Sequence, residues 1–261
     1  MTPIRLTLAA GLLVLAGCAS LPGRDADVEA VLTASGTDAQ LAWLGQPLQP
    51  DNVKGVMSLI PDDWIAAINA TVADQLKPAE LRGHLREALQ KELSGRELAE
   101  VQRFYESPTG RAVVATESGQ GGNAPAVAAD NASLEQLADA TGLGKAVARL
   151  AEKGLGDAFD VALRTNCFGQ GETRFAGLVG GVLKKAQLNA LRRVVGEQVQ
   201  QRYATLTAAQ RTDYLAFAQS RAGQKFFRVR AGVLANAADQ AGTALGTQLT
   251  PRFREFCKPG G

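Results

Sequence analysis

The chain is poor in the residues that most often build catalytic and metal sites, since its 261 residues include one histidine, His84, and three cysteines. It has no His-Glu-x-x-His, Gly-x-Ser-x-Gly or Cys-x-x-Cys motif and no acidic metal-binding loop. Any Ser-His-Asp triad would depend on His84, which lies in a segment expected to form a partly exposed helix. We therefore expect no catalytic residues, no metal and no cofactor, and a protein that is not an enzyme.

Aromatic residues are also scarce, at 5% of the chain, although hydrophobic residues make up 46%. Alanine and leucine carry most of the apolar content, which favours helices that pack through small and aliphatic side chains. The sequence therefore predicts an all-α fold.

Long apolar runs are confined to the N-terminus. Residues 1–17 have the charged start, the apolar run and the small residues before a cut that are typical of a signal peptide. Residues 15–18, Leu-Ala-Gly-Cys, resemble the lipobox of bacterial lipoproteins, which implies acylation of Cys18 and anchoring in a membrane by lipid. The alternative is an ordinary signal peptide with an incidental cysteine. The residue after the cysteine is Ala19, whereas an aspartate there would resemble an inner-membrane retention signal. The resemblance therefore points to the periplasmic face of the outer membrane. Residues 18–26 would then form a tether between the lipid and the folded protein.

Cys167 and Cys257 are the thiols that remain once Cys18 is acylated. A lone pair of cysteines in an oxidising compartment usually forms a disulfide, so we predict that these two are joined. Metal binding and two free buried thiols are the alternatives, and the distance of His84 along the chain argues against a metal.

Charge is distributed unevenly along the chain. Residues 25–119 carry 15 Asp and Glu against 8 Lys and Arg, whereas residues 120–261 carry 11 against 18, so the net charges are −7 and +7. Such an asymmetry can attract a charged partner or make the two halves attract each other. Because the basic residues are spread over several segments and the protein is expected outside the cytoplasm, nucleic acid is not an expected partner.

Two stretches repeat at an offset of 106. Residues 28–36 and 134–142 share their apolar positions, a Ser or Thr and a final glycine, and each predicts a helix that ends at glycine before a second helix begins. Asp27 and Ser133 are the matching N-cap candidates.

Residues 93–110 and 206–223 match at an offset of 113, which a duplication explains if the second copy carries extra residues. Each stretch has a capping box, then a Phe on the same helix, then a serine N-cap and a glycine in the next helix. The glycines are expected to permit close helix packing. These shared positions are Ser94, Glu97, Phe104, Ser107, Pro108 and Gly110 in the first copy, and Thr207, Gln210, Phe217, Ser220 and Gly223 in the second.

A segment rich in glycine and polar residues separates the copies, at 117–125. Such composition is typical of a linker. The sequence thus predicts two tandem helical-bundle repeats, an acidic one at 27–119 and a basic one at 133–261, joined by a Gly-rich linker at 120–132.

Residues 104–111, Phe-Tyr-Glu-Ser-Pro-Thr-Gly-Arg, resemble a bacterial envelope family, number 2059 among the domains of unknown function. Residues 34–38 resemble the opening of the same family. The second copy departs from the motif at Arg221 and Gln224, so the resemblance there depends on the first copy. The family implies a small all-helical periplasmic domain and brings no activity and no site residues.

Two groups of residues have both a functional and a structural interpretation. Asp62, Asp63 and Trp64 could be paired carboxylates beside a sugar-stacking ring, but acidic residues after a proline also typify a helix start. The basic residues of the second copy usually form a solvated face, but they are also possible contacts for an acidic protein partner: Arg192, Arg193, Arg202, Arg228 and Arg230.

The leading hypothesis is a non-enzymatic, lipid-anchored periplasmic protein that binds a protein partner, in its most concrete form an immunity or inhibitor protein that neutralises an antibacterial toxin. The alternatives are an envelope protein that binds or processes peptidoglycan or lipid, and a structural envelope scaffold.

Overall fold

The computed structural model describes residues 22–43, 62–119, 131–142 and 201–256, with a few single residues between them. Every regular element in these residues is a helix, so the fold is all-α. The helices are α1 (Pro22–Ala34), α2 (Thr37–Trp43), α4 (Asp62–Gln75), α5 (Pro78–Glu92), α6 (Gly95–Glu106), α7 (Pro108–Glu117), α8 (Asn131–Thr141), α11 (Ala208–Gln219) and α12 (Arg221–Phe256). We call residues 22–119 the first half and residues 131–256 the second half.

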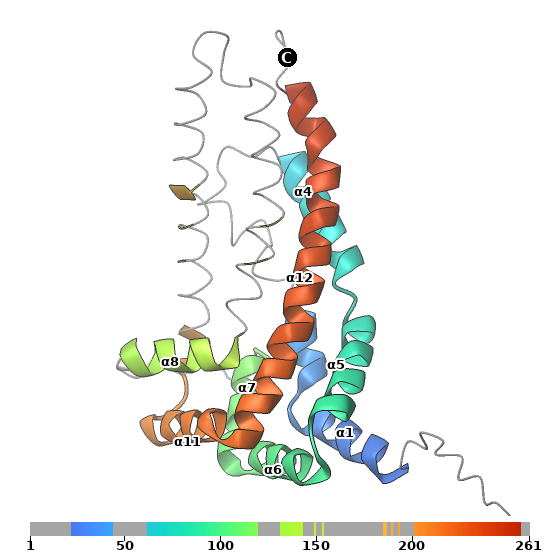
Figure 1. Ribbon diagram of the computed structural model, residues 1–261. Helices are drawn as coiled ribbons and strands as arrows, with labels where there is room; N and C mark the ends of the chain where they lie inside the picture. The colour runs from blue at the N-terminus through green and yellow to red at the C-terminus, as the bar shows by residue number, and fades with distance from the viewer. Residues whose placement is uncertain are drawn as a thin grey trace, which may run out of the picture.

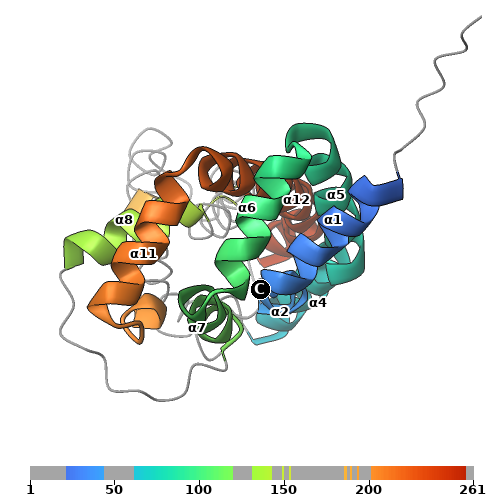
Figure 2. The same ribbon diagram turned by 90° about the horizontal axis from the view of Figure 1, so that it is seen from below.

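The long helix α12 runs the height of the molecule, with α4 beside its C-terminal part and α5 beside its N-terminal part (Figure 1). Its 36 residues correspond to a length of about 54 Å. The shorter helices α1, α6, α7, α8 and α11 gather at the end where α12 begins. Viewed from that end, α6 packs beside α1 and α11 packs beside α8 (Figure 2).

Glycines in the left-handed conformation end α1 and α8. Gly36 has φ +63° and Gly142 has φ +68°, values that an L side chain rarely adopts. A Cβ at Gly36 would also lie 2.5 Å from Cγ1 of Val114, and one at Gly142 would lie 2.9 Å from Cβ of Ala231. Each glycine therefore both terminates its helix and lets a later helix pack close to the turn.

Side-chain caps define where α6 and α11 start. Ser94 accepts a hydrogen bond from the backbone of Glu97, whose side chain in turn accepts one from the Ser94 backbone, and Thr207 and Gln210 form the same reciprocal pair. These are capping boxes, in which two otherwise unpaired backbone N–H groups find acceptors.

The helices α7 and α12 follow immediately, again with serine caps. The hydroxyl of Ser107 accepts from the backbone N–H of Gly110 at 3.0 Å, and that of Ser220 accepts from Gly223 at 3.1 Å. Pro108 occupies the first position of α7, where its missing N–H costs nothing. Each capping-box helix thus turns directly into the next helix at a wide angle (Figures 1 and 2). We call the two helix pairs joined in this way the α6–α7 hairpin and the α11–α12 hairpin.

Both halves contribute to one hydrophobic core. One cluster of contacting residues contains side chains from both halves that are at most 2% exposed. A smaller cluster joins α4 to the C-terminal part of α12 through Ile68, Val72 and Leu245. Within the described residues, the two halves therefore pack on each other and share this core. The shared core includes Val28, Leu89, Leu98 and Val113 from the first half, and Leu137, Tyr203, Ala222 and Phe226 from the second.

Two helix starts differ from the sequence prediction. Asp27 and Ser133 were expected as N-caps, and this is wrong, because both lie inside helices that begin earlier, at Pro22 and Asn131. Consequently the end of the segment expected as a tether (18–26) is helical from residue 22, and residues 131–132 of the expected linker are helical as well. Relative to those caps, the earlier starts add more than one turn to α1 and less than one turn to α8.

Several sequence predictions lie outside the described residues and stay predictions. They are the signal peptide at 1–17, acylated Cys18, the linker residues 120–130, the pair Cys167 and Cys257, and Arg192.

Candidate functional site

The two hairpins meet through a pair of stacked aromatic rings. Phe104 of α6 and Phe217 of α11 lie with ring centroids 3.9 Å apart and planes inclined by 4°, and Tyr105 meets the Phe217 ring edge-on at 5.8 Å. The positions of Phe104 and Phe217 differ by 113, the offset at which the two stretches match in sequence. Equivalent positions of the two hairpins therefore face each other.

Glycine permits the sharp turn within each hairpin. A Cβ on Gly110 would lie 2.0 Å from the carbonyl oxygen of Phe104, and one on Gly223 would lie 1.9 Å from that of Phe217. Both obstacles are backbone atoms of the preceding helix, so a side chain could not be accommodated by rotating a neighbour away. The glycines thus set how closely the first turns of α7 and α12 approach the ends of α6 and α11.

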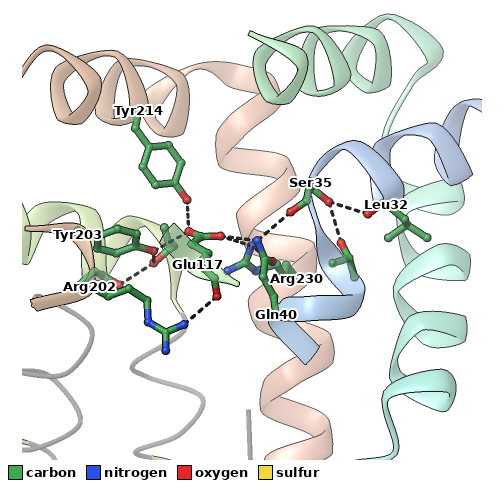
Figure 3. Close-up of polar contacts among 11 residues, drawn as sticks. Leu32, Ser35, Gln40, Glu117, Arg202, Tyr203, Tyr214 and Arg230 are labelled. Atoms are coloured by element: carbon green, nitrogen blue, oxygen red, sulfur yellow. Dashed lines mark hydrogen bonds and ion pairs between the residues drawn. The ribbon is translucent and has the colours of Figure 1, made fainter. Parts of the chain in front are cut away.

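A buried carboxylate lies at the centre of the contact between the halves. Glu117, the last residue of α7, is 1% exposed. Its Oε1 accepts hydrogen bonds from the hydroxyls of Tyr203 at 2.8 Å and Tyr214 at 2.7 Å, and its Oε2 accepts one from the side-chain amide of Gln40 (Figure 3). Nη1 of Arg230 on α12 lies 3.8 Å from Oε2. The carboxylate therefore ties α2, α7, α11 and α12 together.

Gln40 and Arg202 extend this network. The Gln40 amide nitrogen also donates to the carbonyl of Ser35 at 2.9 Å, while its oxygen accepts from Nη1 of Arg230 at 2.9 Å. Arg202 donates to the backbone carbonyl of Glu117 at 2.8 Å, which pairs one of the free carbonyls at the end of α7 (Figure 3). Together with Thr141, whose hydroxyl lies 3.3 Å from that of Tyr203, these residues form what we call the Glu117 cluster.

Burial and the charge of Glu117 together keep the donors of this cluster protonated. Burial, and next the charge of Glu117, raises the pKa of Tyr203 and of Tyr214 well above its ordinary value. For Arg230, burial opposes the charged form, but Glu117 and the neighbouring tyrosine hydroxyls raise the pKa overall. None of these three groups releases a proton near neutral pH, so the arrangement holds a fixed hydrogen-bond pattern and not a proton-transfer site.

Further ion pairs cross between the halves at the edge of the contact. Lys225 of α12 lies 3.0 Å and Arg221 lies 3.4 Å from the carboxylate of Glu97 on α6. Lys225 also donates to the backbone carbonyl of Glu92 at 3.1 Å. The backbone N–H of Ser94, then Lys225, lowers the pKa of Glu97 to about 2.

All these cross-half pairs place the acid in the first half and the base in the second. The uneven charge distribution therefore contributes to attraction between the halves, one of the two explanations that the sequence left open.

The basic residues expected on an exposed face do not share one environment. Arg193 and Arg228 are exposed, whereas Arg202 is only partly exposed and bonds to Glu117. Arg230 is 3% exposed, and its assignment as a contact for a partner is wrong. Its Nη2 makes no hydrogen bond within the described residues. The side chain faces inward because α12 buries Phe226, Phe227 and Leu234, which lie one turn away on either side.

Four further residues singled out from the sequence lie on helices α4 and α5. His84 is exposed on α5, and Asp62, Asp63 and Trp64 form the first turn of α4. Sequence reasoning missed Glu117, Gln40, Tyr203 and Tyr214. One signal could have indicated the central pair, because Glu117 and Arg230 carry opposite charges at the same offset of 113 as the two phenylalanines.

The described residues lack both a metal-binding cluster and a membrane-spanning helix. They contain no group of three or more His, Cys, Asp or Glu side chains that could hold a metal ion. Within the same part of the chain, no helix is both long enough and apolar enough to cross a membrane.

Comparison with known proteins gives a match to a protein family. Residues 79–130 match a family described as "uncharacterized protein conserved in bacteria" (DUF2059). The matched segment begins in α5 and contains the whole α6–α7 hairpin and Glu117. No curated protein and no solved structure matches the chain.

Proposed function

We propose that this protein is a non-enzymatic lipoprotein, held by lipid on Cys18 at the periplasmic face of the outer membrane, that binds a protein partner. Its most concrete form is an immunity or inhibitor protein that neutralises an antibacterial toxin. One observation carries the binding role: the buried carboxylate of Glu117 and the buried guanidinium of Arg230 are engaged with each other and with tyrosines from several helices. Such a network holds helices in place, and a rigid helical surface suits protein recognition.

We further infer that the chain consists of two tandem copies of one helical domain joined by a Gly-rich linker. Three features support this inference at the offset of 113: the capping boxes, the serine-capped turns with their close-packed glycines, and the stacked Phe104 and Phe217. A fourth feature, at the offset of 106, is the pair of left-handed glycines that end α1 and α8. The match to the bacterial family begins at residue 79 and so covers the C-terminal part of the acidic copy, and the basic copy would be its diverged partner.

The partner's contact is proposed on the exposed basic residues of the second half. Arg228 projects from the N-terminal part of α12, and Arg193 is exposed as well. Basic residues on a rigid surface accelerate association with an acidic partner, and their removal slows it most at low salt.

Affinity capture with matched variants tests this function. The bait is the full chain with Cys18→Ser, so that it stays in solution, alone or with Arg228→Glu or Arg103→Glu. Arg103 is an exposed arginine of the first half and serves as the control. We expect one tight protein partner that the unaltered bait and the Arg103→Glu bait retain and the Arg228→Glu bait loses. We also expect that deletion of the gene makes cells sensitive to toxin-delivering neighbours.

Other results of these experiments would favour one of the two alternative functions. Retention of peptidoglycan or lipid in place of a protein would favour an envelope-binding or processing role, especially if alanine at Asp62, Asp63, Trp64 or His84 abolished a turnover. Many weak partners without a tight one would favour a structural scaffold. Unchanged resistance of the deletion strain, together with the absence of a specific protein partner, would contradict the proposed function.

A further inference from the structure

The buried ion pair joins equivalent positions of the two hairpins. Glu117 and Arg230 are separated by 113 residues, as are the stacked Phe104 and Phe217. In a two-fold arrangement of identical units, a residue close to the axis faces its own counterpart. In this chain the phenylalanine faces another phenylalanine, but the acid faces a base. The contact is therefore symmetric in the positions that meet and asymmetric in the charges that these positions carry.

We propose that Glu117 and Arg230 decide which hairpins can pair. The surface of α6 and α7 that carries Glu117 accepts an α11–α12 hairpin, from the same chain or from a second copy of the chain, and rejects another α6–α7 hairpin. This proposal rests on the geometry of the contact between the halves and is independent of the lipid anchor and of the protein partner.

Pairing of two α6–α7 hairpins would bring two carboxylates together in a site where Glu117 is 1% exposed. Like charges removed from water repel strongly, and the site would also lose Arg230. The hydroxyl of Tyr214 would be lost too, because the equivalent position of the first half (214 minus 113) is Val101. An α6–α7 hairpin therefore lacks the donors that its own Glu117 requires.

The ion pair at the edge of the contact can likewise form only between an α6–α7 hairpin and an α11–α12 hairpin. Glu97 pairs with Lys225 across the contact, but the equivalent positions in the other halves are Gln210 and Ala112, which carry no charge. The Phe104 and Phe217 stack, in contrast, could form between any two hairpins, since both supply a phenylalanine. The aromatic stack thus favours pairing in general, and the charged groups select the partner.

Mixing two charge-reversed chains tests this selectivity. One full-length chain carries Glu117→Arg and the other carries Arg230→Glu, both with Cys18→Ser, and differently tagged chains are unfolded and refolded alone or together. Each variant alone has only like charges at the two positions, whereas a mixture can exchange hairpins between chains and pair every charge with its opposite. We expect a 1:1 heterodimer that is more than about tenfold more abundant than dimers of either variant alone.

Two controls make the result decisive. The mixture of Glu29→Arg and Arg82→Glu chains reverses an ion pair of 2.7 Å that lies within the first half, and it should form no heterodimer. The double variant Glu117→Arg with Arg230→Glu restores opposite charges within one chain and should fold as a monomer. Folded single variants that form no heterodimer on mixing would overturn the proposal. If the single variants do not fold, alone or mixed, the double variant decides: a folded monomer supports the selectivity and an unfolded chain overturns it.

Discussion

Substitution of Gly110 by alanine should open the α6–α7 hairpin and destabilise the protein. The new Cβ would lie 2.0 Å from the Phe104 carbonyl oxygen, whereas carbon and oxygen atoms approach to about 3.3 Å, so the helices must separate by roughly 1.3 Å. Overpacking costs up to about 3 kcal/mol, and the higher helix propensity of alanine returns about 1 kcal/mol, which leaves a net loss of about 2 kcal/mol. In a chain of this size that loss lowers the melting temperature by about 4–8 °C.

Gly83 in α5 provides the matched control. It also lies inside a helix, but a Cβ there would meet nothing within 4 Å, so Gly83→Ala should gain about 0.5–1 kcal/mol from helix propensity. Thermal unfolding followed by circular dichroism at 222 nm compares the two variants. If Gly110→Ala melts at or above the temperature of Gly83→Ala, the close approach at Gly110 does not constrain the hairpin, and the reasoning is refuted.

Three further predictions concern acid stability, the anchor and the disulfide. The pKa of Glu97 is about 2 in the folded protein against an ordinary 4.5, so its contribution is complete above about pH 4.5 and disappears as the pH falls toward 2. The stability difference between wild type and Glu97→Gln in urea should therefore shrink over this range, and a constant difference would refute the assignment. Cys18→Ser should release the protein from membranes and abolish palmitate labelling, whereas a variant that still fractionates with the outer membrane contradicts the lipobox. Cys167 and Cys257 should be unreactive to thiol labels in the denatured, unreduced protein, and two free thiols per chain would exclude the disulfide.

Local features of this fold could be predicted from the sequence because their causes are local. The capping boxes at Ser94 and Thr207 depend on residues three positions apart, and the glycines that end α1 and α8 depend on backbone conformation at one residue. The all-α class follows from the same short-range preferences. Helix starts were less accurate, since neither Pro22 nor Asn131 is followed by a pattern that distinguishes it from Asp27 or Ser133 a few residues later.

The Glu117 cluster could not be predicted in the same way, because its members come from distant segments. Glu117 stands next to a Gly-rich stretch, where an acidic residue is ordinarily solvated, and it becomes buried only when α12 places Arg230 beside it. Arg230 was expected on an exposed face because a charge on a helix usually is exposed. Its burial depends on the packing of α12 against helices of both halves, a consequence of tertiary structure.

A double-mutant cycle on Glu117 and Arg230 tests most directly the central claim that this pair joins the two halves. Glu117→Gln and Arg230→Met, alone and together, are compared with the wild type by urea unfolding. Because each single change leaves a buried charge unpaired, each should cost about 3–5 kcal/mol. The double variant should cost less than the sum of the two, with a coupling energy of about 1–3 kcal/mol. Losses that add to within about 0.5 kcal/mol would contradict the account, because they would mean that the two residues stabilise the fold independently of each other.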